Sequence, residues 1–123
     1  MTRPLLVVDD DTDLREALEE VLRDAGYTVM GAGNGREALE VLARARPLPG
    51  LVLLDMMMPV LDGLGFSQEM RTVPEWKDIP VVVFSASAGN AAVAGQVGAR
   101  AYLRKPVDVD VLLETIGQHV EAG

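Results

Sequence analysis

The stretch that decides the fold is residues 51–63, which reads LVLLDMMMPVLDG. Its first four residues are all apolar, and an acid, Asp55, follows them directly. A short apolar run without polar interruptions is typical of a strand that is buried on both faces, as in a parallel sheet. The stretch therefore predicts an inner strand at Leu51–Leu54 that carries Asp55 to one edge of the sheet.

Strands and helices alternate on either side of this stretch. Four more strands are predicted, at residues 5–8, 28–32, 81–84 and 101–104. Helices are predicted where apolar residues recur at a spacing of three or four, at residues 14–25, 34–45, 63–70 and 109–120, and the small-residue stretch at residues 86–98 predicts a weak helix. The order strand-helix occurs five times, which indicates an α/β fold with a parallel sheet covered by helices on both faces. No repeat or linker interrupts the pattern, so we expect a single domain over residues 1–123.

Composition narrows the classes of function. The net charge is -8 and the chain lacks the basic surface with which nucleic-acid binders neutralise phosphates, so we expect no direct nucleic-acid binding. The chain has no cysteine, which excludes disulfides and thiolate metal sites. The apolar run at residues 5–8 is too short for a signal peptide or a membrane span. We therefore expect a cytoplasmic location without membrane contact.

Polar residues follow four of the predicted strands, each at the carboxyl end. They are Asp9, Asp10, Asp55, Ser85 and Lys105. In open α/β sheets, ligands bind beyond the carboxyl ends of the strands, so we expect these side chains to form one site. Three carboxylates in one crevice repel each other, and Mg²⁺ relieves this repulsion with the oxygen ligands it prefers. One carboxylate can then attack phosphorus and form an aspartyl phosphate.

The chain resembles the CheY-like receiver domains of two-component response regulators. The matching motifs are VVDDD at residues 7–11, LVLLDMMMPVLDG at 51–63, VVVFSA at 81–86 and GARAYLRKP at 98–106. The resemblance implies a flavodoxin-like, doubly wound sheet of five parallel strands in the order 2-1-3-4-5 with five helices. It also implies a switch that a histidine kinase or a small phosphodonor phosphorylates, and not an enzyme that acts on an outside metabolite.

The resemblance also implies a role for each residue of the site. Asp55 would be the phosphoacceptor, and Lys105 would contact the phosphoryl group. Asp10, Asp55 and the backbone carbonyl of Met57 would bind Mg²⁺, with Asp9 acting through water. Ser85 would be the switch hydroxyl and Tyr102 the aromatic residue that moves with it. The Lys105-Pro106 peptide bond would be cis, and the face of helix 4, strand 5 and helix 5 would bind the output partner or a second copy.

Other interpretations of the same residues remain open. Asp9, Asp11, Asp13 and Glu20 partly match a calcium loop, although Leu14 stands where that loop needs a glycine. The run DDDTD also resembles the nucleophile loop of a haloacid-dehalogenase-like phosphatase, with Asp9 as the nucleophile. A third alternative is a pseudo-receiver, a protein-interaction module that keeps the fold without the switch.

Two further hypotheses concern the kinetics and the conformational change. Met57 and Ser87 stand at the positions that overhang the site in this family, and both lack the groups that orient water, so we expect slow self-dephosphorylation. The segment 86–98 is rich in glycine and alanine and predicts a marginal helix. We therefore hypothesise that activation orders residues 88–97.

Overall fold

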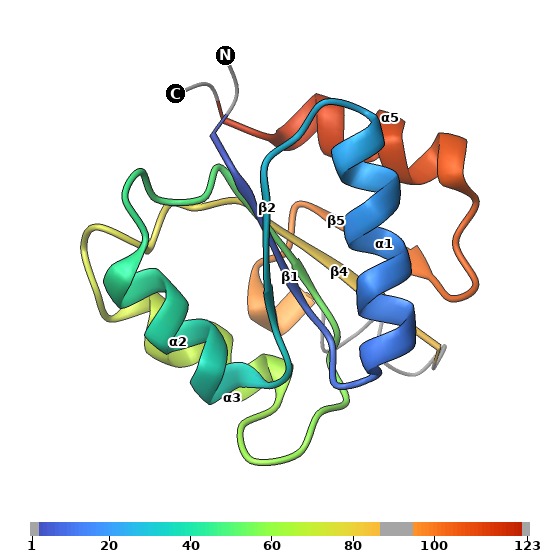
Figure 1. The fold of residues 1–123 in the computed structure, drawn as a ribbon. Coiled ribbons are helices and arrows are strands. Elements are labelled where there is room, and N and C mark those ends of the chain that lie inside the picture. The colour runs from blue at the N-terminus through green and yellow to red at the C-terminus, as the bar shows by residue number, and fades with distance from the viewer. Residues whose placement is uncertain (1–2, 87–94, 122–123) are drawn as a thin grey trace.

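The computed structural model describes residues 3–86 and 95–121 (Figure 1). Five parallel strands form one sheet in the order β2-β1-β3-β4-β5. The strands are β1 (Leu5–Val8), β2 (Val29–Ala32), β3 (Leu51–Leu54), β4 (Val81–Ser85) and β5 (Ala101–Arg104). The helices with described bounds are α1 (Thr12–Asp24), α2 (Gly35–Arg44), α3 (Gly63–Arg71) and α5 (Val109–His119). The predicted α/β fold and strand order are confirmed.

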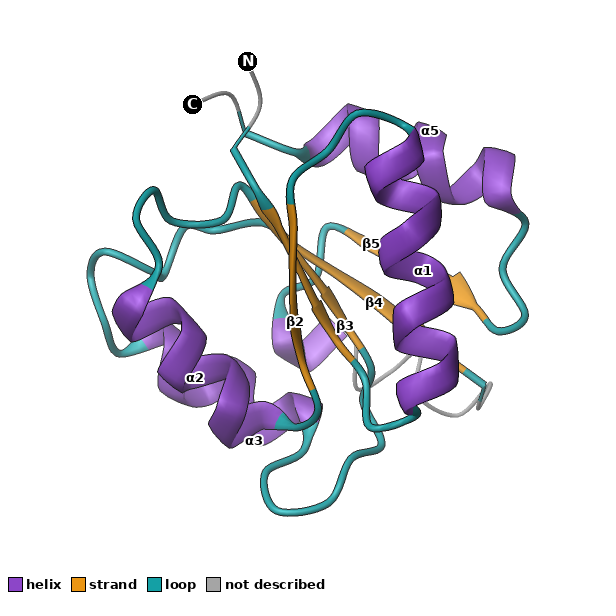
Figure 2. Cartoon of the chain, viewed as in Figure 1, coloured by secondary structure: helices purple, strands orange, loops and turns teal. Residues whose placement is uncertain are grey.

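The helices cover the sheet in two layers. Figures 1 and 2 show α2 and α3 on one face of the sheet and α1 and α5 on the other. Alternate residues of β1 point to opposite faces: Leu6 packs in the cluster that contains Phe66 of α3, whereas Leu5 packs in the cluster that contains Ile116 of α5. Every residue of β1 and β3 is buried, which explains their uninterrupted apolar sequences. Each such side chain contributes about 1.5–3 kcal/mol by leaving water.

Side-chain caps fix where the helices begin. Asn34 accepts a hydrogen bond from the Glu37 N–H at 2.9 Å, as the sequence predicted for the start of α2. Asp11 caps α1 in the same way, so the helix begins at Thr12, before the first apolar residue of the periodic pattern. Each cap of this kind stabilises the fold by about 1 kcal/mol.

The register of the sheet brings the strand ends together. Val8 pairs with Leu54, Leu54 pairs with Val83, and Ser85 pairs with Arg104. The residues that follow these pairs therefore leave the sheet at one edge. Gly63 lets α3 begin directly beside this edge, because a Cβ there would lie 2.8 Å from the Asp55 carbonyl oxygen.

Residues 87–94 lie outside the described part, so Ser87 and most of the segment 88–97 lie there too, and the hypothesis that activation orders this segment stays a prediction. Residues 95–97, at the end of the helix predicted at 86–98, are helical. Within the described ranges, no helix is both long and apolar enough to cross a membrane.

Candidate functional site

A cleft of about 370 Å³ opens at the carboxyl edge of the sheet. Its lining contains all five polar residues that follow the predicted strands, together with three neighbours. The lining residues are Asp9, Asp10, Asp11, Asp55, Met57, Ser85, Ala86 and Lys105. They come from the end of β4 and from the loops that follow β1, β3, β4 and β5, so the predicted convergence of strand ends is confirmed.

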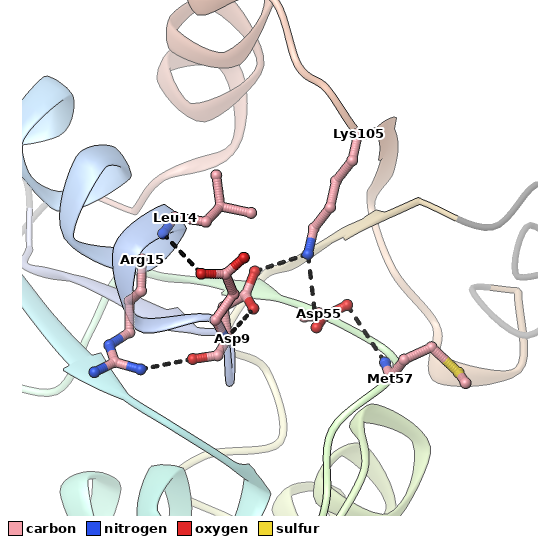
Figure 3. A network of polar contacts seen from close by, with 7 residues as sticks. Asp9, Leu14, Arg15, Asp55, Met57 and Lys105 are labelled. Carbon is pink, nitrogen blue, oxygen red and sulfur yellow. Dashed lines mark hydrogen bonds and ion pairs between the residues drawn. The ribbon is translucent and has the colours of Figure 1, made fainter.

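Two buried carboxylates share one ammonium group. Lys105 Nζ lies 2.8 Å from Asp9 Oδ2 and 3.7 Å from Asp55 Oδ2, as drawn in Figure 3. Asp9 is fully buried and Asp55 is 4% exposed, so water screens the two carboxylates only weakly. Lys105 Nζ also lies 4.5 Å from the centre of the Phe84 ring, which adds a favourable cation–π contact.

The pKa of the Asp55 carboxyl is raised from its ordinary value of 3.8 to about 6. Burial is the largest cause of this rise, and the negative charge of Asp9 is the second. The ammonium of Lys105 and the N–H of Met57 act in the opposite direction. That N–H donates to Asp55 Oδ1 at 3.3 Å. Asp55 is therefore largely ionised at pH 7, but its charge is destabilised by the site.

Three acids could hold a metal ion. Asp9, Asp10 and Asp55 each offer a carboxylate oxygen, and these oxygens lie within 4.8 Å of one another. Asp10 is exposed while the other two are buried, so an ion here would keep contact with water. All the donors are oxygens, and Mg²⁺ binds such sites through one or two carboxylates and several waters. The donor set therefore fits Mg²⁺.

The remaining predicted residues lie around the same cleft. Ser85, at the end of β4, is 1% exposed and faces the cleft. Tyr102 lies on the neighbouring strand β5, half-buried, beside Val83 in register. The Met57 side chain is 67% exposed. The Lys105-Pro106 bond is cis, as predicted.

One contact of the site was missed in the sequence. Arg15 Nη1 donates to the Asp9 carbonyl oxygen at 2.7 Å. The spacing of Arg15 and Glu19 on α1 predicts an ion pair along the helix, and that pair exists at 3.9 Å. No sequence pattern signals a bond from a helix side chain to a strand-end carbonyl.

The calcium-loop interpretation is wrong. Asp11 is the N-cap of α1, where its side chain accepts from the Leu14 N–H at 3.1 Å. Asp13 and Glu20 lie within the helix itself, so the chain here does not form a coordinating loop.

The fold and the cleft define a class: doubly wound α/β proteins with an acidic site at the carboxyl edge of the sheet. The family model for the response regulator receiver domain matches residues 5–117. This chain belongs to the response regulator receiver domain family of two-component systems, whose general function is a phosphorylation switch.

Similar proteins support the assignment. The response regulator MprA of Mycolicibacterium vanbaalenii is 43% identical over 111 residues, which cover 89% of this chain and 46% of that protein. The chain thus spans about half the length of the curated relatives it matches. Chemotaxis protein CheY4 of Vibrio cholerae has a TM-score of 0.87 at 31% identity, covering 98% of this chain and 100% of that one.

A second similar structure contains a ligand. Response regulator TrrA of Thermotoga maritima, solved in complex with Mg(2+)-BeF, has a TM-score of 0.84 at 31% identity, covering 96% of this chain and 99% of that one. The family assignment leaves no basis for the phosphatase alternative, in which Asp9 would be the nucleophile. In this structure Asp9 is instead fully buried and paired with Lys105.

Proposed function

We propose that Asp55 accepts a phosphoryl group from a histidine kinase or a small phosphodonor and that this modification changes how the domain binds its partner. The observation that carries the proposal is the cleft in which Asp55 lies beside a second buried acid and a shared lysine. A carboxylate oxygen of Asp55 would attack the phosphorus atom. A new P–O bond forms, the bond to the donor's leaving group breaks, and the leaving group departs with that electron pair.

The residues of the cleft have distinct roles in this transfer. The Asp55 nucleophile must be ionised, and its pKa of about 6 leaves it so at pH 7. Asp10, Asp55 and the Met57 carbonyl would hold Mg²⁺, with Asp9 acting through water. When bound, the ion supplies positive charge that offsets the negative charge of the phosphoryl oxygens. Lys105, 3.7 Å from Asp55, is close enough to reach an added phosphoryl group.

The switch would follow from the new negative charge. A phosphoryl group brings strong acceptor oxygens, and Ser85 at the end of β4 would donate its hydroxyl hydrogen to one of them. Tyr102 on the adjacent strand would move with Ser85. The output partner, or a second copy, would bind the surface formed by the segment before β5, β5 itself and α5. We further propose a cytoplasmic location and no direct contact with nucleic acid, in keeping with the net charge of -8.

The alternative is a pseudo-receiver that binds partners without phosphorylation. The buried carboxylates argue against it, because buried charges that serve no purpose reduce stability. The site keeps two such acids, Asp9 and Asp55, with one ammonium between them.

Intact-mass measurement tests the proposed function. With acetyl phosphate and Mg²⁺, the wild type should gain the mass of one phosphoryl group, and chelation of Mg²⁺ should prevent the gain. Asp55→Asn should abolish the modification, and Asp10→Asn should weaken metal binding. A modification that persists in Asp55→Asn would refute the assignment of the acceptor.

A further inference from the structure

Arg15 forms a hydrogen bond to the backbone of residues 9–11, which connect β1 to α1. Figure 3 shows it on the side of Asp9 that faces away from Lys105. Its guanidinium donates to the Asp9 carbonyl oxygen at 2.7 Å, while the Asp9 N–H donates to the Ala32 carbonyl oxygen at 3.1 Å. The Asp9 carbonyl belongs to the peptide group that joins Asp9 to Asp10. Arg15 therefore fixes a peptide plane that lies just beyond the end of β1.

This peptide plane determines where Asp10 points. Asp10 is exposed, so its direction depends more on the backbone than on packing around its side chain. On the other side of Asp10, the Asp11 N–H donates to Asp9 Oδ1 at 2.9 Å. Asp10 thus stands between two hydrogen-bonded peptide groups. Since a peptide unit is planar and rigid, release of the first group would let Asp10 swing away from Asp9 and Asp55.

Arg15 is itself held by its neighbours. Its side chain is 18% exposed and lies 3.9 Å from Glu19, which also pairs with Arg23 at 3.5 Å. Arg23 in turn lies 3.4 Å from the Val29 carbonyl oxygen at the start of β2. Glu19 can lie against β2 because residue 31 is glycine: a Cβ there would lie 2.9 Å from Glu19 Oε1. The Glu19 carboxylate thus lies between two arginines and against β2.

We propose that Arg15 is a positioning residue for the metal site and that it acts by orienting Asp10 through the Asp9 carbonyl; this rests on the proposed function, in which the acids bind Mg²⁺. The simpler interpretation is an ion pair along the surface of α1. Such a pair accounts for the long contact with Glu19 but not for the shorter bond to Asp9. Outer groups that orient metal ligands change metal affinity by about 10–100-fold when they are removed.

The charge of Arg15 and its orienting role predict opposite changes in Mg²⁺ affinity when Arg15 is removed, which makes the proposal testable. Arg15 is a cation near the acids, so by charge alone its removal should increase the affinity for Mg²⁺. By orientation, its removal should decrease the affinity. Arg23→Gln is the matched control, because it removes the same charge from the same helix and the same Glu19 partner without touching Asp9.

The experiment is a calorimetric titration of the full chain with MgCl₂. Wild type, Arg15→Gln, Arg15→Lys and Arg23→Gln are compared, with Asp10→Asn as a reference. Arg15→Gln should weaken Mg²⁺ binding roughly 10-fold. Arg15→Lys, which keeps a charged donor, should recover part of the loss, and Arg23→Gln should bind as the wild type does. In the metal-free protein, Arg15→Gln should also speed hydrogen exchange of the Asp11 amide, which Arg23→Gln should not.

The outcomes separate the two proposals. If Asp10→Asn binds Mg²⁺ like the wild type, the proposed metal site itself fails. If Asp10→Asn binds weakly but Arg15→Gln binds as well as or better than the wild type, the positioning role is overturned. Equal weakening in Arg15→Gln and Arg23→Gln also overturns it, because the effect would then belong to the Glu19 pairs. Should Arg15→Gln not fold, Arg15→Lys decides: an affinity between wild type and Asp10→Asn supports the role, and unchanged affinity opposes it.

Discussion

Asp55→Asn should stabilise the metal-free protein at neutral pH. The site raises the pKa of Asp55 from 3.8 to about 6, so folding makes its ionised form less favourable by 6 - 3.8, about two pKa units. Each unit corresponds to about 1.36 kcal/mol, which gives a penalty of about 3 kcal/mol well above pH 6. Asparagine keeps the shape of the side chain and removes the charge. We expect a gain of about 2–3 kcal/mol, which raises the Tm by roughly 8–12 °C for a domain of this size.

The gain should depend on pH in a defined direction. Because the folded pKa of Asp55 lies above the unfolded value, its contribution to stability is fully present below pH 3.8 and is lost as pH rises through about 6. The difference in unfolding free energy between Asp55→Asn and wild type should therefore be small near pH 4, grow through pH 5 and 6, and level off above pH 7. Bound Mg²⁺ should reduce the difference, because it stabilises the wild type by about 2.7 kcal/mol at a hundred times its Kd.

Denaturant unfolding followed by circular dichroism, in EDTA at pH 4 to 8, measures this difference. Asp78→Asn is the matched control: it makes the same chemical change at an exposed side chain in the loop before β4, which does not line the cleft. An Asp55→Asn protein that is no more stable than wild type at pH 7.5 would refute the reasoning. A gain that is equal at pH 4 and pH 7.5 would refute it too, since the gain would not then come from ionisation of Asp55.

Two further changes test other parts of the site. Met57→Asn should speed self-dephosphorylation, because an amide that can orient water would replace the exposed apolar side chain. The decay of the aspartyl phosphate, followed by mass, should be faster than in the wild type. An unchanged or slower decay contradicts the shielding role of Met57. Lys105→Met should destabilise the metal-free protein by about 2–4 kcal/mol in denaturant unfolding, because it leaves the fully buried Asp9 carboxylate without its ammonium partner. A smaller loss in the background of Asp9→Asn would trace the effect to that pair, and equal losses in both backgrounds would not.

The strands and the position of the site were predictable for one physical reason. A parallel strand that is buried on both faces must be apolar throughout, so its last apolar residue marks where the chain leaves the sheet. Leu54 is such a residue, and the acid after it enters the cleft. Once the strands are known to be parallel, the ends of different strands must meet at one edge, and the polar residues that follow them meet there too.

The interactions within the site were less accessible from the sequence. The sequence places Lys105 near the acids but does not say which acid it favours, and in the structure Asp9 is the nearer partner at 2.8 Å. That choice depends on side-chain geometry at the ångström scale. The Arg15 contact with Asp9 depends on the angle at which α1 crosses the end of β1, which no local pattern encodes.

Under the proposed function, the charges of the site couple three events: protonation of Asp55, binding of Mg²⁺ and phosphoryl transfer. Asp9 and Asp55 are buried together with one ammonium between them, so the metal-free site keeps an excess of negative charge. Arg15 and the strand register hold the backbone at this end of β1 by contacts that do not involve the Asp55 carboxylate, while the Asp9 carboxylate itself accepts from the Asp11 N–H. A proton on Asp55 and a cation among the acids relieve the same repulsion, so each should oppose the binding of the other. Mg²⁺ affinity should therefore fall as pH drops through about 6, the pKa of Asp55, and a site that binds Mg²⁺ less well below that pH should also be phosphorylated less readily.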